Sequence, residues 1–131
     1  MAAGTADALS GGSARERGER YEQLALARLR EAGLRPVARN FRCRLGELDL
    51  VMEDGGCLVF VEVRYRKPGR YASAAESVDA RKQCKLQKAA LFFLGRHPAW
   101  RNHAVRFDVV ACDGTGDGLR LEWIKDAFRP G

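Results

Sequence analysis

The chain has 131 residues, of which 46% are hydrophobic and 31% charged, and these values are typical of a single globular domain. Its 23 basic and 17 acidic residues give a net charge of +6, which suits a polyanionic partner such as nucleic acid. No apolar run approaches the ~20 residues of a membrane-spanning helix, and no signal-peptide pattern is present. We therefore expect a cytoplasmic protein with no membrane partner.

The four cysteines are widely spaced, with no CxxC pair and no histidine cluster beside them: Cys43, Cys57, Cys84 and Cys112. This spacing excludes the usual zinc-site patterns. It predicts free thiols in a reducing compartment.

Residues 1–13 are rich in Ala, Gly and Ser, and we expect them to form a disordered tail before one domain over residues 14–131. Ser13 is placed to cap a helix over about residues 14–32, which Gly33 would end. The apolar residues of this helix form one stripe at helical spacing: Tyr21, Leu24, Ala25, Leu29 and Ala32. Glu22 lies on the shoulder of that stripe, where it either forms an ion pair or reaches a site at the sheet.

A first strand is predicted over residues 36–43, and a β-hairpin follows over residues 44–66. Gly55 and Gly56 can adopt the positive φ angles of a two-residue turn, and as its two central residues they would set the pairing register of the hairpin. A three-residue turn, Asp54-Gly55-Gly56, would instead shift the pairing by one and split the carboxylates between faces. One face of the hairpin is then predicted to be apolar and to face the core: Leu48, Leu50, Met52, Val59, Val61 and Val63.

The other face of the hairpin is predicted to carry charged residues in cross-strand pairs. Asp49 lies opposite Glu62, and Glu47 lies opposite Arg64. Two carboxylates directly opposite each other repel unless a cation lies between them, and hard divalent cations prefer such oxygen ligands. Two interpretations remain open: a divalent-cation site, or a solvated and salt-bridged face of an ordinary hairpin.

A second helix is predicted over about residues 78–95, with a buried face formed by Leu86, Ala89, Ala90, Phe93 and Leu94. One turn before that face, Lys82 and Gln83 are polar where a core helix would be apolar. Free N–H groups near a helix N-terminus can meet anions. An adjacent basic stripe either binds nucleic acid or only faces solvent: Arg81, Lys85 and Lys88.

The segment over residues 67–75 is a basic and aromatic loop that either grips a phosphate backbone or is a solvated connection. Two more strands, over residues 103–112 and 119–124, complete the order α-β-β-β-α-β-β. We therefore predict an α/β fold with a mixed central sheet flanked by helices. Asp108 is unusual inside its apolar strand, and we expect it to pair with a basic residue.

Several motifs occur in order between about residues 15 and 128: Gly18-x-x-x-Glu22-x-x-Ala25, Gly46-Glu47-Leu48-Asp49-Leu50, Val59-Phe60-Val61-Glu62-Val63-Arg64, Arg106-Phe107-Asp108-Val109-Val110 and Trp123-Ile124-Lys125-Asp126-Ala127-Phe128. Together they resemble the YraN-type family of small uncharacterised bacterial proteins. That family is similar to the PD-(D/E)xK nucleases and, distantly, to archaeal Holliday-junction resolvases. The resemblance implies a restriction-endonuclease-like core.

The resemblance also implies a metal site that binds Mg²⁺ or Mn²⁺. Asp49 and Glu62 would take the two acidic positions of the nuclease motif. Glu22 would add a carboxylate from the first helix, and Glu47 would be an outer or alternative ligand.

One residue departs from the nuclease pattern, because Arg64 stands where the superfamily usually has lysine. A guanidinium cannot lose its proton at any working pH, so Arg64 could stabilise transition-state charge but could not act as a base. Gln83 or Lys82 would take the polar position on the second helix.

The implied function is a Mg²⁺-dependent endonuclease, and the substrate we expect is DNA rather than RNA, including branched or structured DNA. Basic residues would contact the nucleic acid: Lys82, Arg81, Lys85, Lys88, Arg66, Lys67 and Arg70. The alternative is a nucleic-acid-binding module on the same fold that does not cleave. Resolvase-like folds often work as symmetric dimers, so a homodimer is among the expected assemblies.

Overall fold

The computed structural model describes residues 13–66, 78–114 and 116–129. The elements follow the predicted order α-β-β-β-α-β-β, with two short 3-10 helices: α2 (Ala14–Glu31), β1 (Arg35–Cys43), β2 (Gly46–Asp54), β3 (Cys57–Arg66), α3 (Ala80–Arg96), η2 (Pro98–Trp100), β4 (Ala104–Asp113), η3 (Gly116–Gly118) and β5 (Arg120–Phe128). The predicted tail up to residue 12 lies outside the described residues, as do Lys67 and Arg70.

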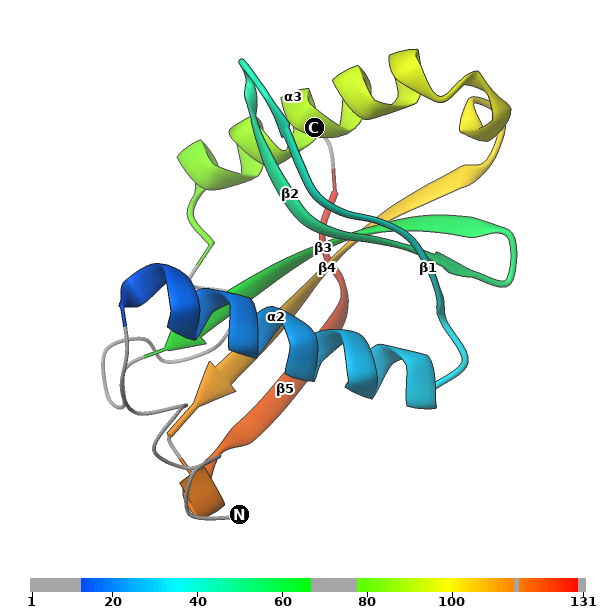
Figure 1. Ribbon diagram of the computed structural model, residues 1–131. Coiled ribbons are helices and arrows are strands. Elements are labelled where there is room, and N and C mark those ends of the chain that lie inside the picture. Colours follow the sequence, from blue (N-terminus) through cyan, green and yellow to red (C-terminus); the bar gives the residue numbers. More distant parts are fainter. Residues whose placement is uncertain (1–12, 67–77, 115, 130–131) are drawn as a thin grey trace.

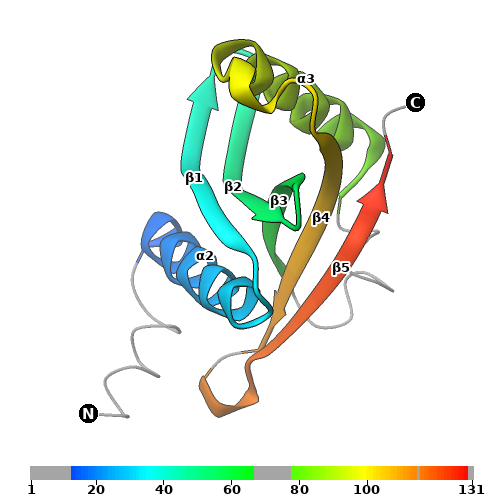
Figure 2. The same ribbon diagram turned by 90° about the vertical axis from the view of Figure 1, so that its right-hand side faces the viewer.

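The strands form one five-stranded mixed sheet in the order β1-β2-β3-β4-β5. Strands β3 and β4 are parallel, and the other neighbouring pairs are antiparallel. A parallel pair needs a long crossover connection, and α3 lies in that connection. Helices α2 and α3 cover opposite faces of the sheet (Figures 1 and 2), so its central strands are buried on both sides.

Two hydrophobic cores follow from this layering. The α2-side core joins the helix to alternate residues of the central strands: Tyr21, Ala25, Leu29, Leu34, Leu50, Met52, Val59, Val61, Val110 and Cys112. The α3-side core uses the intervening residues: Leu48, Val51, Leu58, Phe60, Val78, Leu86, Ala89, Ala90, Phe93, Phe107 and Val109. The prediction of only one apolar face on the hairpin was too narrow, because α3 buries the second face as well.

Helix α2 begins and ends as the sequence predicts. The Ser13 side chain accepts the backbone N–H of Glu16 at 3.2 Å, and the Glu16 carboxylate accepts the N–H of Ser13, which completes a capping box. Gly33 follows the helix with a φ of 97°, which favours glycine. Ala32, predicted to belong to the buried stripe, is exposed because the helix ends at Glu31.

The turn of the β2–β3 hairpin is confirmed. Gly55 and Gly56 have φ angles of 57° and 89°, as a two-residue hairpin turn with positive φ at both positions requires. Leu50 pairs with Val61 in the resulting ladder, which is the predicted register. This register brings the two predicted acidic residues to neighbouring positions on adjacent strands.

The prediction that Leu48 shares a face with Leu50 and Met52 is wrong. Leu48 packs in the α3-side core, whereas Leu50 and Met52 pack in the α2-side core. The change of face occurs at Asp49. Asn40, the β1 residue between the flanking cross-strand pairs, has a φ of 51°, a left-handed conformation that Asn tolerates. The left-handed residue of β1 therefore lies beside the point at which the side chains of β2 stop alternating between the two faces of the sheet.

The ends of two other elements also differ from the prediction. Helix α3 begins at Ala80 with Asp79 as its cap, and Val78 is a buried core residue before the helix. Strand β5 continues to Phe128, past the predicted end at residue 124. The pairing of β5 with β4 becomes irregular before this end, and Asp126 in the irregular part has a φ of 52°.

All four cysteines lie in the described part of the chain, and all are free thiols, as predicted.

Neither of the long helices described here is apolar enough over a sufficient length to cross a membrane.

Candidate functional site

The site forms where the regular pairing of β2 with β3 ends. The backbone ladder runs from the turn to the pair Leu50–Val61, and Asp49 is the next residue of β2. A carboxylate oxygen of Asp49 accepts the backbone N–H of Val63 at 2.9 Å. The Asp49 side chain therefore takes over a donor of β3 that a backbone carbonyl would otherwise satisfy. This bond anchors the carboxylate between the two strands.

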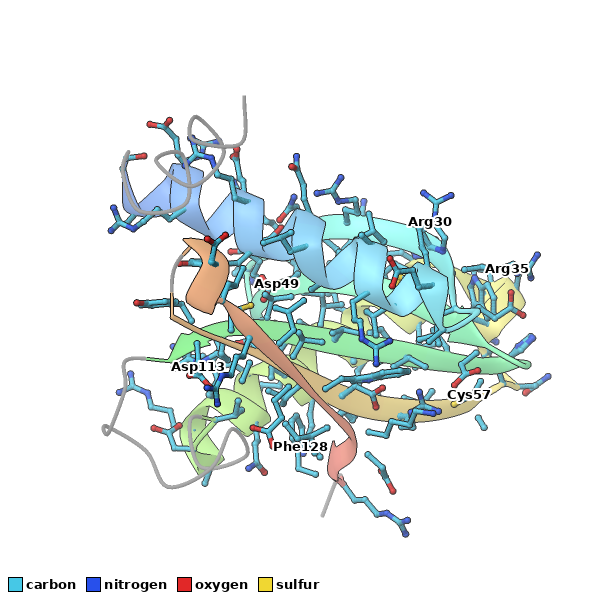
Figure 3. All side chains as sticks on the ribbon, turned by 90° about the horizontal axis from the view of Figure 1, so that it is seen from below. Arg30, Arg35, Asp49, Cys57, Asp113 and Phe128 are labelled. Carbon is cyan, nitrogen blue, oxygen red and sulfur yellow. The ribbon has the colours of Figure 1, made fainter. Side chains whose placement is uncertain are left out.

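Glu62 reaches the same place from the other face of the sheet. Its side chain is 4% exposed, and its Oε2 lies 3.1 Å from Nζ of Lys82 on α3. Asp49 lies between α2 and the strands (Figure 3). The two carboxyl groups are nevertheless close enough for the Asp49 carboxylate to raise the pKa of Glu62. The predicted convergence of these two acids is therefore present, although their side chains approach from different sides.

The Glu62 carboxyl is held in its protonated form by its surroundings. Burial raises the pKa of Glu62 far above its ordinary value, and the Asp49 carboxylate raises it further. The ammonium group of Lys82 acts in the opposite direction but does not outweigh them. At neutral pH the acid pair therefore holds a proton that a divalent cation could displace.

Glu22 brings a third carboxyl to the site from α2. Burial raises the pKa of Glu22 to about 7, and the negative charges of Asp49 and Glu47 add to the effect while Arg39 opposes it. Its Oε1 is buried and has no hydrogen-bond partner. Of the two predicted roles for this residue, reaching a site at the sheet is the one that its position fits.

Glu22 also lines two cavities between α2 and the sheet. The larger has a volume of about 500 Å³ and is lined by Arg15, Gly18, Glu19, Glu22, Asn40, Arg42 and Glu47. The smaller has a volume of about 250 Å³ and is lined by Ala14, Arg17, Gly18, Tyr21, Glu22, Asp49, Val63 and Tyr65. Both cavities are open to solvent, so a ligand can reach Glu22 from either cavity and Asp49 from the smaller one.

The prediction that Glu47, Asp49, Glu62 and Arg64 share one face is wrong, because β2 changes face at Asp49. Glu47 is exposed and lies 3.6 Å from Arg42 at the rim of the larger cavity. Arg64 is half-buried, and its Nε has no hydrogen-bond partner. The interpretation of a solvated hairpin face fits Glu47 but fails for the buried Glu62.

The start of α3 places Lys82 beside Glu62. The Asp79 side chain caps the helix by accepting the backbone N–H of Lys82 at 2.8 Å. The Gln83 amide donates to the carbonyl of Val78 at 3.0 Å, so this side chain supports the first turn. A catalytic role for Gln83 stays a prediction.

Close packing of the β1–β2 hairpin against α3 depends on Gly46. A Cβ atom at Gly46 would lie 3.0 Å from the backbone carbonyl oxygen of Lys85.

Among the predicted nucleic-acid contacts, Arg81, Lys85 and Lys88 are exposed on α3. Their binding role stays a prediction, as does that of Arg66 at the end of β3.

Within the described ranges, no three His, Cys, Asp or Glu side chains are already grouped as a metal site. Asp49, Glu62 and Glu22 are the residues that could close around an ion, since hard divalent cations take carboxylate oxygens and complete their shell with water. Two other features of the site have no direct signal in the sequence: the contact of Lys82 with Glu62, and a stacked pair formed by Tyr21 and Tyr65. The alternation of side chains along β3 is a partial signal for the stacked pair. Tyr65 lies two residues after Val63 and therefore on the same face of the sheet as Val63.

Comparison with known proteins gives a consistent result. A family model described as "Uncharacterised protein family UPF0102" matches residues 21–112. A UPF0102 protein of Stutzerimonas stutzeri (strain A1501) is 54% identical over 111 residues, which cover 85% of this chain and 92% of the relative. One of Halorhodospira halophila (strain DSM 244 / SL1) is 50% identical over 115 residues, covering 88% of each chain. One of Xanthomonas campestris pv. campestris (strain B100) is 54% identical over 114 residues, covering 87% and 92%.

Proposed function

The chain belongs to the uncharacterised protein family UPF0102, and because that description states no activity, we propose from the site itself that it is a divalent-cation-dependent endonuclease. The proposed substrate is DNA, including branched or structured DNA, and the proposed reaction is hydrolysis of a phosphodiester bond. The motif resemblance to restriction-endonuclease-like nucleases supports this choice.

The observation that carries the proposal is that the negative charge of Asp49 adds to burial in raising the pKa values of two glutamates, Glu22 and Glu62. Glu62 is buried beside Lys82, and Glu22 keeps a buried oxygen without a partner. A purely structural site would be expected to give the buried Glu22 oxygen a hydrogen-bond partner. Mg²⁺ or Mn²⁺ fits this donor set because both are hard cations that prefer carboxylate oxygens.

In the proposed complex, Asp49 and Glu62 hold the cation, and Glu22 and Glu47 lie at the side as additional or outer ligands. A bound Mg²⁺ or Mn²⁺ would polarise the scissile phosphate and lower the pKa of a coordinated water. Glu22, which titrates near neutral pH at the edge of both cavities, can exchange a proton with solvent there.

Two basic residues have separate proposed tasks at the phosphate. Lys82 brings an ammonium group to the acid pair from α3, and it supplies the positive charge that the usual motif lysine would supply from β3. Arg64 keeps a buried Nε without a partner and can donate to a phosphate oxygen. Since a guanidinium does not release its proton, Arg64 is assigned charge stabilisation and no base role.

Charge outside the site supports nucleic acid as the partner. The chain has a net charge of +6, and exposed basic residues line α3 next to Lys82: Arg81, Lys85 and Lys88. Phosphate contacts of this kind release counterions, so binding should weaken steeply as salt is raised.

The test is cleavage of supercoiled, linear and branched DNA by the purified chain with Mg²⁺ or Mn²⁺. We expect nicking or cutting that stops on chelation and that is lost in Asp49→Ala. Asp117→Ala, which removes an exposed carboxylate in η3, is the matched control and should cleave as the unchanged protein does. Cleavage that persists in Asp49→Ala would belong to a contaminant or to another site.

A second candidate function is a nucleic-acid-binding module that does not cleave. Arg64 at the lysine position favours it, and so does the fact that the described residues hold no ready-made group of three metal ligands. This alternative predicts salt-dependent DNA binding with no cleavage under any metal.

A further inference from the structure

The smaller cavity has an aromatic wall beside the carboxyl groups. The rings of Tyr21 and Tyr65 are stacked, with centroids 5.0 Å apart and an angle of 14° between their planes. Tyr21 is buried in the α2-side core, whereas Tyr65 is 43% exposed although one face of its ring is stacked. The exposed ring is therefore held in a fixed orientation by a buried partner.

The lining and the volume of this cavity favour a flat and neutral ligand. Its ionisable lining consists of the carboxyl groups of Glu22 and Asp49 and the guanidinium of Arg17, so negative groups outnumber positive ones. Such a lining disfavours a second phosphate. A volume of about 250 Å³ is slightly below the range of about 300–1,000 Å³ found for drug-sized ligands, and it suits one ring system.

Gly18 keeps this space open. It lies inside α2, where glycine destabilises a helix relative to alanine. A Cβ atom added at Gly18 would meet no atom within 4 Å, so packing against neighbours does not require glycine there. Gly18 lines both cavities, and an added methyl group would narrow them.

We infer that this cavity binds a nucleobase of the substrate strand, stacked on Tyr65 while the adjoining phosphate lies at Asp49. This inference rests on the proposed function and narrows its substrate class. A base inside an intact duplex is stacked between its neighbours and cannot enter the cavity, so the nucleotide beside the cleaved bond must be unpaired. Single strands, flaps, and frayed or branched junctions offer such a nucleotide, and a fully paired linear duplex does not.

Base stacking on an aromatic side chain tolerates any base and contributes measurably to single-strand affinity. The test uses the full chain without metal, so that binding is measured in the absence of cleavage. The probe is a single-stranded DNA oligonucleotide carrying one 2-aminopurine, compared with the same oligonucleotide in a complete duplex. We expect quenching of 2-aminopurine on binding of the single strand and none with the duplex.

Two substitutions at Tyr65 distinguish the effect of its aromatic face from the effect of its apolar bulk. Tyr65→Phe keeps the aromatic face and should retain both quenching and affinity. Tyr65→Leu keeps apolar bulk without a π-face and should lose the quenching and bind the single strand roughly tenfold more weakly or worse. Circular dichroism checks that each variant is folded. Affinity for the duplex should be equal in all three proteins.

Equal single-strand binding by Tyr65→Leu and the unchanged protein would overturn the inference, as would an equal loss of affinity for the duplex. Free deoxyadenosine monophosphate, added as a competitor, distinguishes a strand from a free nucleotide. Displacement of the strand only at a large excess supports a strand site, whereas displacement at equimolar concentration would overturn it. Because this assay contains no metal, its result is independent of whether Asp49→Ala abolishes cleavage.

Discussion

Two buried carboxylates in neighbouring strands have opposite surroundings. Asp108 of β4 is 1% exposed, and Glu62 of β3 is 4% exposed. Asp108 accepts two hydrogen bonds from Arg106 at 2.8 and 2.9 Å, one from the Trp123 indole and one from the backbone N–H of Asp126, both at 2.9 Å. Glu62 faces a second carboxylate and a single lysine.

The difference separates a structural group from a functional one. The bonds to Asp108 join β4 to the irregular part of β5, and Arg106 also contacts Asp54 at 3.1 Å. Every oxygen of that carboxylate is used within the fold. The group around Glu62 instead keeps a proton and leaves an oxygen of Glu22 without a partner. Stability alone explains the first arrangement, and the second is the basis of the proposed cation site.

The largest effect on stability is expected at the structural carboxylate. Asp108→Ala leaves the guanidinium of Arg106 and two N–H donors without their acceptor, and it should lower the free energy of unfolding by about 3–5 kcal/mol. Urea denaturation measures this change. Asp117→Ala, an exposed control, should stay within about 0.5 kcal/mol of the unchanged protein. A loss below 1 kcal/mol in Asp108→Ala would contradict the structural assignment.

A smaller and pH-dependent effect is expected at Glu22. Because the pKa of Glu22 is raised from 4.5 to about 7, the folded state binds this proton more tightly than the unfolded state does. The resulting stabilisation is present below pH 4.5 and is lost as the pH rises through 7. Relative to Glu22→Gln, the free energy of unfolding of the metal-free protein should fall by on the order of 1 kcal/mol across this pH window, after allowance for solvent screening.

Melting temperatures of the two proteins, measured in parallel from pH 4 to 8 with a chelator present, give this difference. A difference that stays constant with pH would show that Glu22 is ordinarily solvated.

Gly18→Ala should stabilise the protein by roughly 0.5–1 kcal/mol, because alanine favours the helix and its methyl group meets no neighbour. The same change should weaken binding of the single-stranded oligonucleotide, since it narrows both cavities. Gly95→Ala, in α3 and equally free of neighbours, is the matched control for the helix effect and should leave binding unchanged. A gain in stability with full binding would remove the functional reason for glycine at this position.

The smallest effect on stability is expected for Glu62→Gln, which completes the comparison with Asp108. At pH 7 the Glu62 carboxyl is already protonated, so an amide replaces a neutral group and stability should change by less than about 1 kcal/mol. Cleavage should nevertheless be lost. A destabilisation as large as that of Asp108→Ala would show that Glu62 is a structural ion-pair partner of Lys82.

Local features of the sequence were enough to predict much of the fold and the centre of the site. Ser13 and Gly33 predicted the limits of α2, and the Gly55–Gly56 turn fixed the register that brings Asp49 and Glu62 to adjacent strands. The polar break at Lys82 was visible on the predicted helix. These signals are local, since each depends on residues close together in the chain.

The remaining features depend on contacts between distant segments. The change of face at Asp49 accompanies a left-handed Asn40 on another strand, so it has no signature within β2 itself. The burial of Glu62 requires α3 to cover the second face of the sheet. Asp108 was expected to pair with a basic residue, but its bonds to Trp123 and Asp126 depend on the irregular pairing of β5.

The central claim is that Asp49 and Glu62 meet in order to bind a divalent cation. Calorimetric titration of the metal-free chain with Mn²⁺ tests it most directly, with Asp49→Asn and Asp117→Ala titrated in parallel. We predict that the unchanged protein and Asp117→Ala bind one cation with equal affinity, that this affinity rises with pH, and that Asp49→Asn binds at least tenfold more weakly. Undiminished binding by Asp49→Asn, or no binding by the unchanged protein, would contradict the claim.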